Sequence, residues 1–184
     1  MTDVNRFLIA LPLAAIACAA APAAYAVQYL TVEAAQKLMF PDATAFALLR
    51  LPFTAEQWRA IDAKSHATSQ ARQFLVFRVE RDGKTIGTFT VDEVIGKTEL
   101  ITYAVAIGTD QRIKQVEILA YRESHGYEVR NPRWRDQFVG KGADAPVTLG
   151  DDISSISGAT LSCRHITDGV RRILAVQAML DASK

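Results

Sequence analysis

The dipeptide Asp82-Gly83 constrains the fold of this chain more than any other feature, because it lies between two stretches of alternating residues. A type I′ turn needs positive φ angles at both central residues, and Asp-Gly tolerates them. Along 73–79 successive side chains are expected on opposite faces of a strand, and the alternation resumes over about 85–91. The sequence therefore predicts a β-hairpin at this point.

Two further stretches extend the hairpin into a sheet. Residues 100–107 and 113–121 again alternate apolar side chains, and Gly108-Thr109-Asp110 supplies a turn between them. Strands that follow one another through short turns usually pair with each other. The pattern therefore predicts a meander of four antiparallel strands.

Three helices are predicted around this sheet. Thr31 is an N-cap for a helix over 31–39, and Thr54 with Gln57 forms a capping box for a second helix. The last helix is expected from about 163 to 181, where apolar residues recur at helical spacing. Its solvent-facing side is predicted to carry Arg164, Arg171, Arg172 and Asp181.

The segment 122–157, between the last strand and the last helix, is too long for a plain connection inside a compact domain and is expected to be functional. The fold class is therefore α+β: an antiparallel β-sheet meander flanked by helices, with a long functional loop and a C-terminal amphipathic helix. Residues 27–184 are expected to form a single domain.

Composition excludes several classes of function. The net charge is +1 and aromatic residues make up 8%, so neither a basic field nor a stacking surface for nucleic acid is expected. The chain has two cysteines, Cys18 and Cys163. If the N-terminal segment is removed, only Cys163 stays in the chain, and an intramolecular disulfide is excluded. The three histidines lack metal-ligand spacing.

The first 26 residues resemble a secretory signal peptide. Arg6 precedes an apolar run over 7–21, and Ala24-Tyr25-Ala26 is a small-x-small cleavage site. Cleavage after Ala26 would place the domain in the periplasm or otherwise outside the cytoplasm. The alternative is a retained membrane anchor formed by residues 7–26.

Small hydroxyl residues and a glycine directly precede the last predicted helix, over 154–162. The N-terminus of a helix presents free N–H groups and positive dipole, which together can hold a phosphate. Arg164 and Arg172 add positive charge nearby. The same residues also suit an ordinary N-cap, so physical reasoning alone leaves both interpretations open.

The hexapeptide Ser157-Gly158-Ala159-Thr160-Leu161-Ser162 resembles the S/T-G-A-T-x-S/T motif of the FMN-binding domain family. That family includes the flavinylated domains of the sodium-pumping NADH:quinone oxidoreductase C subunit and the Rnf complex G subunit, together with small exported flavoproteins. The resemblance implies FMN held covalently through a phosphoester made by a flavin transferase. Ser162 is the implied attachment residue, with Thr160 as the alternative.

A second stretch, Glu123-Ser124-His125-Gly126-Tyr127, resembles the E-T-x-G loop that packs against the flavin in this family. The family often has an acidic residue at the place of Ser154, and this departure lowers the expected efficiency of flavinylation. The residues implied to bind the cofactor come from both stretches and the start of the helix: Ser157, Gly158, Ala159, Thr160, Leu161, Glu123, Ser124, His125, Gly126, Tyr127 and Arg164.

The resemblance implies an extracytoplasmic electron-transfer flavoprotein, more an electron carrier than a stand-alone enzyme. Its implied partners are the flavin transferase and a redox partner such as a cytochrome or a membrane electron-transfer complex. Two alternatives stay open: a flavin-dependent reductase of a small substrate, and an exported anion-binding module without flavin.

Overall fold

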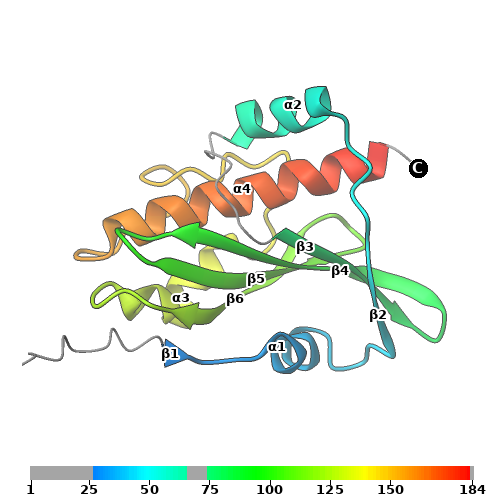
Figure 1. Ribbon diagram of the computed structural model, residues 1–184, viewed down its shortest axis with the longest axis horizontal. Coiled ribbons are helices and arrows are strands. Elements are labelled where there is room, and N and C mark those ends of the chain that lie inside the picture. The colour runs from blue at the N-terminus through cyan, green and yellow to red at the C-terminus, as the bar shows by residue number, and fades with distance from the viewer. Residues whose placement is uncertain (1–26, 66–73, 183–184) are drawn as a thin grey trace, which may run out of the picture.

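The computed structural model describes residues 27–65 and 74–182, and these build an α+β fold around one six-stranded antiparallel sheet (Figure 1). The strand order is β1-β6-β5-β4-β3-β2. The predicted signal peptide, residues 1–26, lies outside the described residues. None of the helices within the described ranges has both the length and the apolar character that crossing a bilayer requires.

The predicted meander forms the centre of the sheet and is confirmed. Its strands are β3 (Phe74–Arg81), β4 (Lys84–Ile95), β5 (Leu100–Gly108) and β6 (Ile113–Tyr121). Asp82 and Gly83 have φ angles of 51° and 74°, as the turn between β3 and β4 requires. Strand β4 continues beyond the predicted 85–91, because its residues 87–95 pair with β5.

Two short strands extend the sheet beyond the predicted meander. Strand β1 (Val27–Gln28) pairs with β6, and β2 (Ala45–Leu48) pairs with β3. The register places Val27 opposite Tyr121, the last residue of β6. The N-terminal end of the described chain is thus held beside the point where the long 122–157 segment begins.

Helices cover both faces of the sheet (Figure 1). Helix α1 (Val32–Met39) covers one face, and the 23-residue helix α4 (Thr160–Ala182) covers the other, where α2 (Ala55–Ser65) packs beside it. Both predicted caps are confirmed. Thr31 Oγ1 accepts a hydrogen bond from Ala34 N at 3.1 Å, and Thr54 and Gln57 exchange their two capping bonds.

Within the segment 122–157, residues 127–138 fold into short helical turns. They are η1 (Tyr127–Arg130), α3 (Pro132–Arg135) and η2 (Asp136–Phe138). Trp134 Nε1 donates to Ser154 O at 2.8 Å, and Ser154 N donates to Gln137 Oε1 at 2.8 Å. These bonds fix the chain just before the hydroxyl-rich motif.

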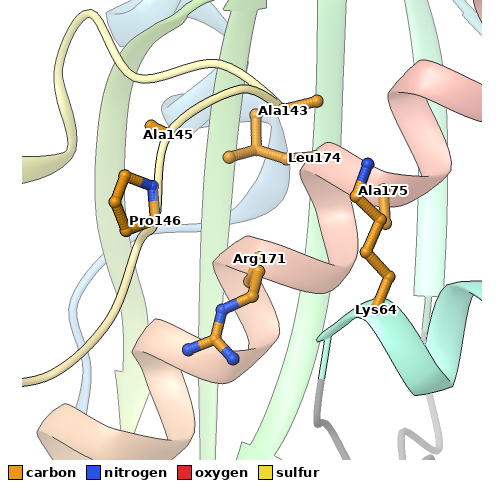
Figure 2. A pocket seen from close by; sticks show the side chains of 7 residues that line it. All are labelled: Lys64, Ala143, Ala145, Pro146, Arg171, Leu174 and Ala175. Carbon is orange, nitrogen blue, oxygen red and sulfur yellow. The ribbon is translucent and has the colours of Figure 1, made fainter.

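Arg171 joins α4, α2 and the end of this segment. Its guanidinium donates to Val147 O and to Ser65 O, each through a bond of 3.0 Å. A cavity of about 120 Å³ lies beside it. Figure 2 shows the side chains that line this cavity, which come from the two helices and the loop around Pro146. Because Arg171 is already bonded to the backbone, its role at this cavity is structural.

The prediction that Arg172 of α4 faces solvent is wrong, because this residue is buried. Its Nη2 lies 2.7 Å from both carboxylate oxygens of Asp92, and Tyr103 Oη donates to Asp92 Oδ2 at 2.5 Å. A side chain at Gly169 would put its Cβ 2.1 Å from Tyr103 Oη. Glycine there lets α4 approach the sheet closely enough for the buried ion pair to form.

Candidate functional site

The hydroxyl-rich motif forms a turn followed by the first turn of α4. Gly158 has a φ of 84°, a left-handed conformation that glycine adopts without strain. Ala159 O then accepts the first helical hydrogen bond, from Cys163 N at 2.9 Å. The helix therefore begins three residues before the predicted start at 163, and Thr160, Leu161 and Ser162 belong to it.

The two candidate attachment hydroxyls differ in accessibility. Thr160, the first residue of α4, is exposed. Ser162 is only 5% exposed, and its Oγ lies 2.9 Å from Tyr121 Oη. Successive helical residues are rotated by about 100° around the axis, so positions 160 and 162 face different directions. Thr160 faces solvent and Ser162 faces the sheet.

The fold brings the second sequence motif against the first. Gly126 has a φ of 88°, and a Cβ there would lie 3.3 Å from Ala159 Cβ and 2.6 Å from Tyr121 Oη. Tyr121 Oη also lies 2.6 Å from His125 O. The 123–127 loop thus rests on the start of α4, with the Tyr121 hydroxyl between them.

Glu123, at the start of that loop, has a structural role. Its carboxylate accepts hydrogen bonds from the backbone N–H groups of Lys97, Thr98 and Glu99, in the turn between β4 and β5. Partial burial by itself would raise the pKa of Glu123, but the N–H donors from Glu99, Thr98 and Lys97 outweigh it and hold that pKa below its ordinary value. This carboxylate anchors the loop and is not free for a ligand.

A hollow of about 360 Å³ opens beside the loop. Its walls come from β1 and the residues after it, from the end of β6 and from the loop: Val27, Tyr29, Tyr121, Arg122, Glu123, Ser124 and Tyr127. Tyr127 is 58% exposed, and the Arg130 guanidinium lies 3.4 Å from the centre of the Tyr29 ring. The volume and aromatic lining suit a planar ring system.

The model of the family described as FMN-binding domain matches residues 96–175. This part of the chain is an FMN-binding domain. The match spans β5, β6, the long segment and most of α4, so it includes both motifs. The comparison with curated proteins gives no match. The fit to FMN is also physical: an exposed hydroxyl and a helix N-terminus suit its phosphate, and the aromatic hollow suits its ring.

The remaining predicted cofactor-binding residues of the FMN-binding domain fall into two groups. Those at the surface, free to meet a ligand, are Ser157, Gly158, Leu161, Arg164, Ser124, His125 and Tyr127. Ala159 and Gly126 are buried and pack on each other, so they set the approach of loop to helix. Ser124 Oγ lies 2.9 Å from His125 Nδ1, which links two of the surface residues.

Two neighbours of the motif, Cys163 and His165, are engaged in structural contacts. Cys163 is a free thiol with no exposed surface, and burial raises its pKa, so it fills space in the core as a neutral group. His165 Nδ1 lies 2.5 Å from Ile95 O and 2.9 Å from Gly96 O. The His165 ring therefore ties the first turn of α4 to the turn after β4. Within the described ranges, no cluster of residues could hold a metal ion.

Tyr121 is the site residue that sequence reasoning missed. It is 2% exposed at the end of β6, where the alternating pattern marks it only as a strand residue. Its partner Ser162 is 41 residues away in the chain, and no local spacing relates the two. Burial raises the pKa of the Tyr121 phenol, so the hydroxyl keeps its proton across the physiological range.

Proposed function

We propose that this FMN-binding domain is an extracytoplasmic electron-transfer flavoprotein whose FMN phosphate is esterified to the hydroxyl of Thr160. The observation that carries the choice of residue is the difference in exposure within one helical turn. Thr160 is exposed at the first position of α4, whereas Ser162 is buried and bonded to Tyr121.

Accessibility supports the choice of Thr160, because in this proposal a second enzyme makes the bond. A flavin transferase has to bring FAD within bonding distance of the acceptor oxygen. In the folded domain the Ser162 side chain is 5% exposed and its Oγ lies 2.9 Å from Tyr121 Oη. Thr160 is exposed and therefore easier for the transferase to reach. The geometry therefore favours the alternative acceptor over Ser162, the first choice from the resemblance.

The proposed attachment reaction is a phosphoryl transfer from FAD to the Thr160 hydroxyl. The Thr160 oxygen attacks the phosphorus on the FMN side of FAD, the pyrophosphate P–O bond breaks, AMP leaves, and the hydroxyl proton passes to solvent or to a base on the transferase. The resulting phosphodiester keeps one negative charge. The first turn of α4 supplies unbonded N–H groups and positive dipole for it, and Arg164 is a nearby exposed cation.

The electron-transfer role rests on the cofactor and on the form of the site. FMN supplies the redox chemistry, and the chain supplies attachment, orientation and a wall for the ring. The hollow bounded by Tyr29, Tyr121 and Tyr127 lies beside the 123–127 loop, which itself contacts Ala159, the neighbour of Thr160. An isoalloxazine ring placed there stays close to the surface, as exchange of electrons with a docked protein requires.

The experiment is intact-mass analysis of protein co-expressed with a flavin transferase. Wild type and Ser162→Ala are expected to carry one added FMN, less one water, and Thr160→Ala to carry none. Ser157→Ala is the matched control, because it removes another exposed hydroxyl of the same motif. An unmodified wild type would refute covalent attachment, and FMN retained in Thr160→Ala but lost in Ser162→Ala would return the attachment to Ser162.

Electron transfer and location are tested separately. The flavinylated protein should be reduced by a chemical donor and reoxidised by a cytochrome on the timescale of mixing, without consuming a small organic substrate. In cells, the native chain should fractionate with the periplasm and begin at Val27. A mature protein that keeps residues 7–26 and sediments with membranes would support the anchored alternative.

A further inference from the structure

The hollow beside the 123–127 loop has two charged residues in its wall, Arg122 and Glu123. The carboxylate of Glu123 already accepts bonds from backbone N–H groups of the turn after β4. Arg122, in contrast, forms no ion pair with any residue that the structure describes. The largely aromatic wall therefore contains one guanidinium whose charge is available to whatever the hollow binds.

The register of the sheet explains why this guanidinium is held in place. Thr102 of β5 pairs with Ala120 of β6 and with Glu93 of β4. Side chains two residues apart along a strand direction share a face, so Arg122, two residues after Ala120, comes beside Thr102. The Arg122 Nη1 atom donates to Thr102 Oγ1 at 3.1 Å and to Leu100 O at 3.4 Å.

These bonds hold Arg122 through Nη1 alone. Thr102 Oγ1 donates its single proton to Glu93 Oε1 at 3.0 Å, so it can only accept from Arg122. Within the described ranges, Arg122 Nε and Nη2 make no hydrogen bond, and neither atom is buried. The guanidinium is thus fixed on one side and keeps free N–H donors on the other.

A fixed cation with free donors is suited to the charge that reduction places on a flavin ring. Two electrons from the redox donor and one proton from solvent, added at N5, leave one negative charge shared by N1 and the C2 carbonyl oxygen. Arg122 supplies no proton, because a guanidinium stays protonated in proteins. It contributes a fixed positive charge and N–H donors, and charge near N1 is one means by which proteins tune a flavin.

We infer that Arg122 stabilises the negative charge of the reduced FMN ring and so raises its reduction potential. The inference rests on the proposed function in placing the ring in the hollow, and it does not depend on which hydroxyl of the motif carries the phosphate. Thr102 is a positioning residue in this assignment, because it holds Nη1 and leaves Nε and Nη2 for the ring.

The test compares the reduction potentials of the flavinylated full-length wild type, Arg122→Gln and Arg122→Lys. Arg122→Gln should lower the equilibrium constant for reduction about tenfold, the effect of one hydrogen bond to a charged group, or about 30 mV for a two-electron couple. Arg122→Lys keeps the charge and should stay closer to wild type. Sulfite gives an independent measurement, because its addition to N5 places the same negative charge on the ring. Arg122→Gln should bind sulfite about tenfold more weakly.

Two further variants separate a charge in the hollow from charge and packing elsewhere. Arg133→Gln is the matched control, because Arg133 is exposed, has no ion pair with the described residues and does not line the hollow. It should leave the potential and the sulfite affinity at their wild-type values. Thr102→Val keeps the guanidinium but removes its hydroxyl partner, and it should lower the potential by less than Arg122→Gln.

The inference is overturned if Arg122→Gln keeps the potential and the sulfite affinity of wild type, or if Arg133→Gln lowers them equally. A lower denaturation midpoint in Arg122→Gln with an unchanged potential also overturns it, since Arg122 would then only stabilise the strand ends.

Failure of the proposed function is read from mass, because the wild type would then carry no covalent FMN. Free FMN titrated into that unmodified protein gives the same comparison of variants, since the inference concerns the ring and not the bond. A protein that also fails to bind free FMN would overturn the inference together with the proposed function.

Discussion

The buried ion pair between β4 and α4 gives the sharpest prediction about stability. Asp92 and Arg172 have side chains that are 0% and 4% exposed, and they are bonded at 2.7 Å. Asp92→Asn keeps the shape of the side chain but removes its charge, and it leaves the Arg172 guanidinium buried without a counter-charge. Breaking such a pair from one side costs about 3–5 kcal/mol in the free energy of unfolding.

For a domain of this size, that loss corresponds to a decrease in Tm of roughly 6–20 °C, since each kcal/mol shifts Tm by about 2–4 °C. Urea denaturation and calorimetry would measure it. Replacing both partners, as Asp92→Asn with Arg172→Met, should recover much of the loss, because no uncompensated charge then remains. The exposed pair Arg112–Asp144 is the control, and Asp144→Asn should leave the midpoint almost unchanged.

A cost below about 1 kcal/mol for Asp92→Asn would refute this reasoning, because it would mean that water or a rearranged side chain compensates Arg172. Strict additivity of the two single substitutions would refute it as well, since partners in direct contact should show an interaction energy. A change in the m-value alongside the midpoint would instead indicate an altered denatured state.

Three further predictions test the packing and the loop anchors. Gly169→Ala should lower the free energy of unfolding by about 1–3 kcal/mol, because the added Cβ would overpack against Tyr103 Oη. The decrease should be smaller in a Tyr103→Phe background. Equal decreases in both backgrounds would contradict the close approach of residue 169 to Tyr103 Oη. Glu123→Gln should be less stable than wild type at neutral pH, and the difference in stability should shrink as the pH falls below about 4.5. The reason is that a carboxylate with a lowered pKa loses its stabilising contribution when it is protonated. A difference in urea midpoints that does not change with pH would exclude this role for the Glu123 carboxylate. Cys163 should resist alkylation in the native protein and react only after denaturation, which a thiol-reagent time course would show.

The features that could be predicted from sequence are those set by neighbouring residues. The Asp82-Gly83 turn, the alternation along β3 to β6 and the Thr54–Gln57 capping box all depend on a few adjacent positions, and all were confirmed. Strands β1 and β2 were missed because two and four residues carry no readable period. Only their pairing with β6 and β3 makes them strands.

The errors at α4 have the same physical origin in tertiary contacts. Arg172 was assigned to the solvent-facing side because charge usually marks that side, but α4 lies between the sheet and α2 and buries a charge that Asp92 neutralises. The sequence predicts the helix from about 163, because the Ser and Gly residues before it suit an N-cap and a turn. Packing of Ala159 against Gly126 extends the helix to Thr160.

The position of β1 places the N-terminal end of the described chain beside the proposed flavin site. Val27 would be the first residue after cleavage at Ala26, and it pairs opposite Tyr121 and lines the hollow. Cleavage at the predicted site would therefore leave a free ammonium group at the rim of the hollow, close to the surface by which the proposed redox partner would approach. Retention of residues 7–26 would instead bring this same rim toward the membrane. The two alternatives for the N-terminus thus predict different redox partners, a soluble cytochrome in the first case and a membrane electron-transfer complex in the second.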